Sequence, residues 1–218
     1  MSRPERHRPQ FTVLVAGTAT EVGKTWVAAR LLETARDRGH TVAARKPVQS
    51  FDPAEGITDA AVLAAASDET VDEVCPADRS YPLAMAPPIA ARELGRTVPT
   101  TEKLLDQVRW PPDVELGVVE AVGGVRSPLS ADGDTTDLAD ALRPDLVILV
   151  ANAGLGTINV VRLCAEALDG HRVVTFLNRF DASDAVARNN REWLHERDGF
   201  AVETEMDGLL GWAFGTVS

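Results

Sequence analysis

The chain has 218 residues, is 44% hydrophobic and carries a formal net charge of −11. This length fits one α/β domain with a full core, which we expect over residues 11–218. The acidity, without a basic stripe, argues against a nucleic-acid partner. No apolar run approaches the roughly 20 residues of a membrane span, which argues against a membrane partner.

Residues 1–10 are charged and contain prolines, and they lack the apolar core of a signal peptide. We therefore expect a disordered N-terminal arm on a cytoplasmic protein. Cys75 and Cys164 lie far apart without metal-like spacing, as is typical of a reduced compartment.

The first predicted strand, 11–16, runs into a glycine-bearing loop that ends in Gly23-Lys24-Thr25, and a helix is expected from Lys24 to about residue 38. Loop N–H groups and the helix N-terminus can wrap a polyphosphate. Lys24 can contact the terminal phosphates, and the Thr25 hydroxyl can hold Mg²⁺. The loop is one residue longer than the common G-x-x-x-x-G-K-[ST] pattern, because five residues separate Gly17 from Gly23.

Strand and helix signals then alternate, which predicts βαβ units and a mostly parallel sheet with helices on both faces. Further strands are expected at 41–45, 115–120, 145–152 and 172–177. Further helices are expected at 59–66, 88–94, from 100 or 101 to 108, 134–142, 158–168 and 184–196, the last capped by Ser183. A loop is expected over 46–59 and irregular structure over 74–97, and no structure is assigned to 201–218.

Polar residues follow the carboxyl ends of several predicted strands, where ligands bind in open α/β sheets. These residues are Lys24, Thr25, Lys46, Ser50, Glu120, Asn152 and Asn178. Because parallel strands end at one edge of the sheet, we expect these side chains to share one site.

Mg²⁺ prefers oxygen ligands and keeps several waters, so Thr25, Asp59 and Glu120 form the natural ligand set. Asp59 has an alternative role as the N-cap of the helix that it begins. Lys46, held by Pro47, indicates an additional negative charge to stabilise. The alternative is that Lys46 is a solvated lysine after an edge strand.

Several segments together resemble the dethiobiotin synthetase family, in order from about residue 12 to 180. The loop 17–25 carries that family's longer glycine spacing, and Lys46-Pro47-Val48-Gln49-Ser50 resembles its second motif. Further similar segments are Tyr81-Pro82 with 85–88, the stretch 118–124, and 155–159. The resemblance implies a P-loop NTPase-like three-layer fold and an ATP- and Mg²⁺-dependent ligase of biotin biosynthesis. Such a ligase closes a ureido ring on 7,8-diaminononanoate with CO₂, through a carbamate and its phosphorylated anhydride.

The resemblance also implies roles for individual residues. Lys24 and Lys46 are implied to be catalytic, and Thr25, Asp59 and Glu120 to hold Mg²⁺. The nucleotide would contact Glu21, Val22, Gly23, Lys24, Thr25, Trp26, Asp59, Glu120, Ala121, Val122, Gly123, Asn178 and Arg179. The diamine would contact Thr20, Lys46 and Ser50, together with Gly156, Thr157, Ile158 and Asn159 of a second subunit in a homodimer.

The chain departs from the family pattern in four places, of which Arg126, just beyond the stretch 118–124, is one. Ala121 stands where the family usually has glycine, which is expected to crowd the backbone near the nucleotide. Arg179 replaces a residue that is often acidic, and the C-terminal Gly-x-x-Pro-Trp motif is missing.

Two other functions stay open at this stage. A ParA-like or MinD-like ATPase switch would carry an additional lysine early in the loop, where this chain has Thr18 and Ala19. A nucleotide-binding relative that has lost catalysis would fit the altered glycines. A cobyrinic acid amide synthase would need a glutaminase domain that this length cannot hold.

Overall fold

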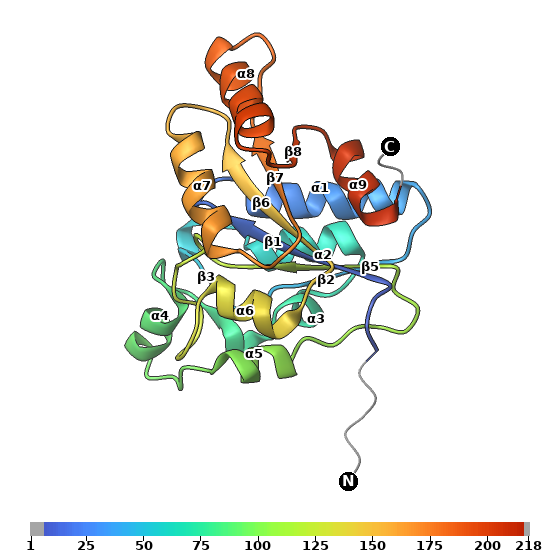
Figure 1. Cartoon of the computed structure of the whole chain (residues 1–218). Helices are drawn as coiled ribbons and strands as arrows, with labels where there is room; N and C mark the ends of the chain where they lie inside the picture. Colours follow the sequence, from blue (N-terminus) through green and yellow to red (C-terminus); the bar gives the residue numbers. More distant parts are fainter. Residues whose placement is uncertain (1–6, 216–218) are drawn as a thin grey trace.

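A computed structural model describes residues 7–215 and shows a six-stranded parallel sheet between two layers of helices (Figure 1). The strand order is β2-β5-β1-β6-β7-β8. The strands are β1 (Phe11–Gly17), β2 (Val42–Arg45), β5 (Leu116–Glu120), β6 (Leu146–Asn152), β7 (Val173–Asn178) and β8 (Val202–Glu203). The parallel three-layer fold predicted from the alternating pattern is confirmed.

The central strands are apolar on both sides because both faces of the sheet are covered. Along β6, Ile148 packs into the core on one face, whereas Val147 and Leu149 pack into the core on the other. All three are fully buried. This explains why 145–152 is the most apolar stretch of the chain.

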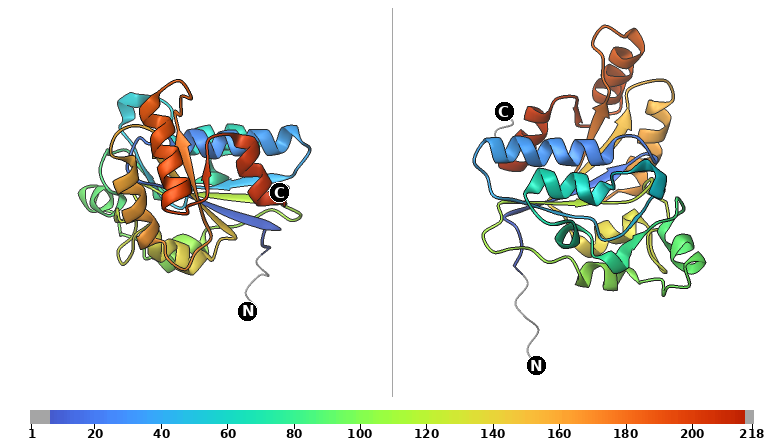
Figure 2. Two further views of the ribbon diagram at one scale, coloured as in Figure 1. Left: turned by 45° about the horizontal axis from the view of Figure 1, so that its top comes forward. Right: turned by 180° about the vertical axis from the view of Figure 1, so that it is seen from behind.

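The helices divide between the two faces, and Figure 2 shows α1 and α2 side by side when the molecule is seen from behind. One core contains residues of α1, α2, α3 and α9, and the other contains residues of α4 to α8. The helices are α1 (Lys24–Asp37), α2 (Asp59–Ser67), α3 (Val71–Val74), α4 (Pro87–Glu93), α5 (Thr101–Asp106), α6 (Thr135–Leu142), α7 (Thr157–Ala167), α8 (Ala185–Glu192) and α9 (Met206–Phe214). Among residues 7–215, no helix is both long and apolar enough to cross a membrane.

A second, two-stranded parallel sheet lies beside the main one, where the sequence indicated only loops. Its strands are β3 (Gln49–Ser50) and β4 (Ser80–Tyr81). The strands are two residues long, too short for a periodic pattern to identify them. Short helical turns, η1 (Pro53–Glu55) and η2 (Ala77–Arg79), occupy the flanking segments.

Three local predictions need correction. The cap of α8 is Asp184, whose carboxylate accepts from the Val186 N–H at 2.9 Å, and the Ser183 hydroxyl instead donates to Asp181. The α-helix ends at residue 192 and continues as a π-helical turn, η3 (Trp193–Arg197). The unassigned tail contains β8 and α9, which extend the sheet and cover one face.

The described end of the N-terminal arm is bound to the domain, in contrast to the disorder expected of it. Arg8 donates to the Arg143 carbonyl at 2.8 Å, and Pro9 is buried against Gly117 of β5. Residues 1–6 lie outside the described residues.

The packing of Pro9 against β5 leads to a stability prediction. A Cβ at Gly117 would lie 2.4 Å from Cγ of Pro9 and 2.9 Å from the Trp110 ring. Gly117→Ala is therefore expected to lower the free energy of unfolding by about 1–3 kcal/mol, measured by urea denaturation. The control is Gly154→Ala, where no atom of the described residues lies within 4 Å of the new Cβ. Equal stability of the two variants would contradict the packing.

Candidate active site

The loop between β1 and α1 is built to receive an anion. Gly23 begins α1 with a φ of 95°, and no side chain of the described residues caps this helix. The first turn also lacks acidic residues, so its N–H groups face the loop with the positive end of the helix dipole. A Cβ on Gly23 would lie 2.1 Å from Nδ2 of Asn178, so both its backbone angle and its surroundings require glycine.

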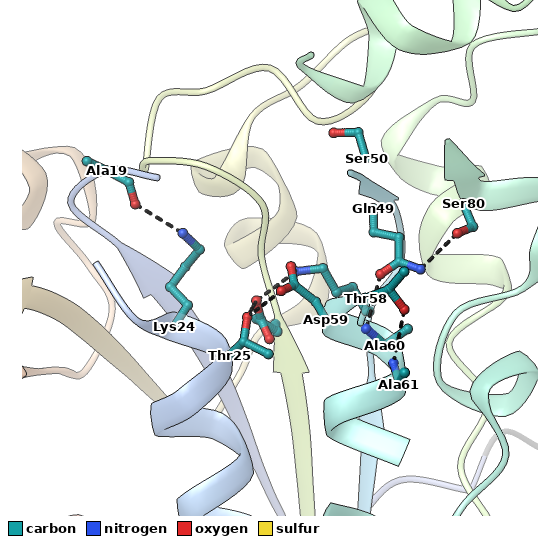
Figure 3. A network of polar contacts seen from close by, with 12 residues as sticks. Ala19, Lys24, Thr25, Gln49, Ser50, Thr58, Asp59, Ala60, Ala61 and Ser80 are labelled. Atoms are coloured by element: carbon teal, nitrogen blue, oxygen red, sulfur yellow. Dashed lines mark hydrogen bonds and ion pairs between the residues drawn. The ribbon is translucent and has the colours of Figure 1, made fainter. Parts of the chain in front are cut away.

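Lys24 is folded back onto this loop, where its Nζ donates to the Ala19 carbonyl at 3.0 Å (Figure 3). The side chain is buried. Burial, together with the positive charge of Lys46, lowers the pKa of Lys24 to about 8. A phosphate bound in the loop would supply the negatively charged partner that the Lys24 ammonium lacks.

Thr25, in the first turn of α1, joins two carboxylates from other elements. Its Oγ1 lies 2.8 Å from Oδ1 of Asp59 (Figure 3). It also lies 2.9 Å from Oε1 of Glu120. The N-cap of α2 is Thr58, whose side chain accepts from the Ala61 N–H. The alternative role of Asp59 as a cap is therefore wrong, and its carboxylate is directed into the site.

Lys46 lies at the centre of these groups and is 1% exposed. Its Nζ lies 2.6 Å from Oε1 of Glu120 and 2.8 Å from Oδ2 of Asp59. Burial opposes the charge, but the two carboxylates outweigh it and raise the pKa of Lys46 above its ordinary value. The alternative of a solvated lysine is therefore wrong, although β2 is an edge strand.

The pKa values of the two carboxyl groups in the cluster are shifted in opposite directions. Burial raises the pKa of Glu120, which is 1% exposed at the end of β5. Burial also acts on Asp59, but Lys46 outweighs it and lowers the pKa of that carboxyl. Asp59 thus stays ionised, and Glu120 depends on its cationic neighbours for its charge.

One oxygen of the cluster, Oε2 of Glu120, is buried without a hydrogen-bond partner among the described residues. A buried acceptor of this kind is costly unless a ligand satisfies it. With the Thr25 hydroxyl and the half-exposed Asp59 beside it, this oxygen belongs to a donor set that fits Mg²⁺. Residues 7–215 contain no group of three or more His, Cys, Asp or Glu side chains that could hold a metal, and the donor set described here instead combines two carboxylates with one hydroxyl.

These groups line a cavity of about 810 Å³. The predicted site residues that the structure brings together in its lining are Thr20, Glu21, Gly23, Lys24, Thr25, Lys46, Ser50, Asp59, Glu120, Val122, Gly123 and Arg179. They come from the phosphate loop, the segments after β2 and β5, the start of α2 and the end of β7. Val22, Trp26, Ala121, Asn178 and the segment 156–159 lie outside this lining.

Ala121 and Asn178 lie next to lining residues but are not themselves part of the lining. The Ala121 side chain is buried in one of the two cores. The crowding that the sequence suggested is therefore not observed, because the additional carbon points into the core and not into the cavity. The amide of Asn178 donates to the Val22 carbonyl at 2.9 Å and accepts from the Arg179 N–H at 3.0 Å. Asn178 thereby fixes the phosphate loop to the end of β7.

The predicted segment 156–159 begins α7, apart from this cavity. No side chain of the described residues caps this helix, its first turn lacks acidic residues, and Gly156 and Asn159 are exposed. Leu155, just before it, is 91% exposed. The start of α7 is thus a second open helix N-terminus, on the surface of this chain.

Several lining residues were not predicted, notably Gln49, Phe51, Ile57, Met85 and Ser127. Gln49 and Met85 stand inside segments that resemble family motifs, so proximity to Lys46 and Pro87 could have indicated them. Phe51 and Ile57 lie in a connecting loop whose residues show no periodic pattern.

The chain is similar to known proteins both in sequence and in fold. The model of the family described as "AAA domain" matches residues 11–178. The ATP-dependent dethiobiotin synthetase of Xanthomonas campestris pv. campestris (strain 8004) is 38% identical over 84% of this chain and 84% of its own length. That of Caulobacter vibrioides (strain NA1000 / CB15N) is 42% identical over 72% of this chain and 73% of its own length.

Solved structures support the fold alone. A plasmid partition protein from Borrelia burgdorferi B31 bound to AMPPNP superimposes with a TM-score of 0.58 at 13% identity, over 96% of this chain and 100% of its own. The signal recognition particle receptor FtsY from Elizabethkingia anophelis gives 0.52 at 14% identity, over 93% of this chain and 62% of its own. From the sequence relatives, this chain belongs to the dethiobiotin synthetase family.

Proposed function

We propose that this chain, an ATP-dependent ligase of biotin synthesis, closes the ureido ring of dethiobiotin from 7,8-diaminononanoate and CO₂. The observation that carries this proposal is the buried Lys46, held between Asp59 and Glu120 beside the phosphate loop. A switch protein carries its lysines in the phosphate loop, whereas a buried ammonium outside that loop suits a reaction that develops charge beyond the phosphates.

The reaction has three balanced steps. One amine of the substrate adds to CO₂ and loses a proton, which gives a carbamate. A carbamate oxygen attacks the γ-phosphorus of ATP, and ADP leaves. The second amine attacks the carbonyl carbon and loses a proton, which closes the ring and expels phosphate. Lys24 and Lys46 stabilise the negative charge on the carbamate and on the transferring phosphoryl group.

The oxygen donor set described above would hold Mg²⁺ through Thr25, Asp59 and Glu120. When bound, the ion would neutralise charge on the β- and γ-phosphates of ATP. Lys46 already bridges the two carboxylates, so it keeps them oriented toward the phosphate loop.

The nucleotide would lie along residues 21–26 and would also contact Val122 and Gly123, which line the same cavity. Asn178 uses one of its two amide hydrogens on the Val22 carbonyl, so the other remains for an acceptor on the base. Arg179 stands beside it in the cavity lining. Thr20 and Ser50 supply hydroxyls on the substrate side, although Ser50 donates to the Met85 carbonyl in this structure.

We further propose a homodimer in which the carboxylate of the substrate binds at 156–159 of a second copy. The uncapped start of α7 supports this, because a helix N-terminus without acidic residues attracts carboxylates. We also propose a cytoplasmic enzyme without a membrane partner, and the acidic composition supports the absence of a nucleic-acid partner.

The function is tested by a coupled phosphate-release assay with ATP, Mg²⁺ and bicarbonate. Phosphate should appear only when 7,8-diaminononanoate is present. Lys46→Met should lower kcat by about 10²- to 10³-fold, because one preorganised charge is lost from the transition state.

The matched control for this assay is Lys103→Ala, which removes an exposed lysine and should leave kcat unchanged. Binding of ATP to the Lys46 variant, measured by calorimetry, shows that it is folded. Phosphate release without the diamine, or full activity of Lys46→Met, would refute the proposal.

The lowered pKa of Lys24 predicts that ATP affinity depends on pH. Phosphate binds the charged ammonium, and the free protein loses this proton as pH rises through about 8. The Kd for ATP should therefore rise above about pH 8, by up to about tenfold per pH unit. Calorimetry over pH 7 to about 9.5 measures it. Lys24→Arg, whose guanidinium stays charged, should bind with little pH dependence in this range. A wild-type Kd that is constant with pH would be inconsistent with this role.

The homodimer is tested by sedimentation equilibrium, which should give about twice the 23.4 kDa of one chain. Leu155→Asp places a charge on the exposed residue before α7 and should yield monomers with a raised KM for the diamine. Val71→Asp, at a half-exposed site on α3, is the control and should stay dimeric. A fully active monomer would contradict the shared site.

A further inference from the structure

The cavity has an apolar side that the reaction with phosphates does not use. Phe51, Ile57 and Met85 line it, and we call these three residues the apolar wall. Ile57 is 76% exposed, Met85 is 47% exposed and Phe51 is half-buried. Of the large apolar side chains exposed in the described structure, only Ile57 and Met85 line this cavity. Exposed apolar groups gathered in a ligand cavity indicate an apolar ligand group.

The wall is built from two segments that the small sheet holds together. The Phe51 N–H donates to the Tyr81 carbonyl at 3.0 Å, which extends the pairing of β3 with β4. The Ser50 hydroxyl donates to the Met85 carbonyl. These bonds hold the two segments together where they line the cavity, and Figure 3 shows Ser50 apart from the cluster of Lys24, Thr25 and Asp59.

The far end of the loop is fixed to the catalytic cluster. Ile57 immediately precedes Thr58, the cap of α2, and lies two residues before Asp59. Gln49, next to Ser50, accepts from the Ala60 N–H at 3.1 Å and donates to Ser80 at 2.8 Å (Figure 3). The apolar wall thus has a fixed position relative to Lys46 and Asp59.

The cavity therefore combines a charged floor with an apolar side wall, and the proposed substrate is divided in the same way. Its two amines must meet Lys46 and the phosphate, whereas its methylene chain needs apolar contact. We propose that the apolar wall binds the methylene chain of the diamine and selects long-chain over short vicinal diamines, with Ile57 as the main specificity-determining residue. This inference rests on the proposed function.

The test compares two diamines on matched variants. Ile57→Ala removes three carbons from the wall, which should lower kcat/KM for 7,8-diaminononanoate by about 10-fold. With 2,3-diaminobutane, which keeps the vicinal amines but lacks the chain, kcat/KM should not change. The control is Ile89→Ala, the same substitution at a 47% exposed residue of α4 outside the cavity lining. It should change neither value.

Calorimetry without nucleotide gives a second measurement that needs no turnover. The Kd for 7,8-diaminononanoate should rise about 10-fold in Ile57→Ala and stay unchanged in Ile89→Ala. An equal loss with both diamines, or no loss in affinity, would overturn the apolar wall while leaving the ligase function intact. If wild-type protein neither binds nor converts the diamine, the proposed function fails instead.

Discussion

The site depends on one buried ion cluster, in which the Lys46 ammonium lies between the carboxylates of Asp59 and Glu120. A charge buried to this extent is stable only when its partners are fixed in place. Three separate segments supply the three groups, and the Thr25 hydroxyl joins them to the phosphate loop. Removing one partner from such a cluster costs about 3–5 kcal/mol, because another charge is left uncompensated. The same four side chains, those of Thr25, Lys46, Asp59 and Glu120, therefore contribute to the stability of the fold and set the geometry of the site.

The cluster also explains how two lysines in one cavity can differ. Lys46 has two carboxylate partners, so its pKa is raised and it stays charged. Lys24 is also buried, but its nearest polar partner is a neutral carbonyl, so its pKa falls to about 8. Lys46 is therefore charged with or without a ligand, whereas Lys24 gains a negatively charged partner only when a phosphate binds.

The sequence was sufficient for those features that have strong local signals. The apolar runs located β1, β5, β6 and β7, and the glycine spacing located the phosphate loop. Polar residues at strand ends indicated Lys46 and Glu120, because parallel strands end at one edge. The sequence could not distinguish a capping Asp59 from one directed into the site, since that choice depends on contacts with distant Thr25 and Lys46. The apolar wall was missed because Phe51 and Ile57 follow no periodicity, and their position depends on the two-residue strand β3.

The separation of β3 and β4 from the main sheet has a consequence for how this family can diverge. The phosphate loop is anchored in a six-stranded sheet, where a changed residue disturbs the core on either face. Phe51 and Met85 instead lie beside a small sheet joined by few hydrogen bonds. By our proposal for the apolar wall, mutations there alter which organic molecule is accepted while ATP chemistry is preserved. The phosphate loop and the main sheet thus tolerate few changes, whereas the segments beside β3 and β4 tolerate more. Changes in substrate would therefore be expected to arise in those segments.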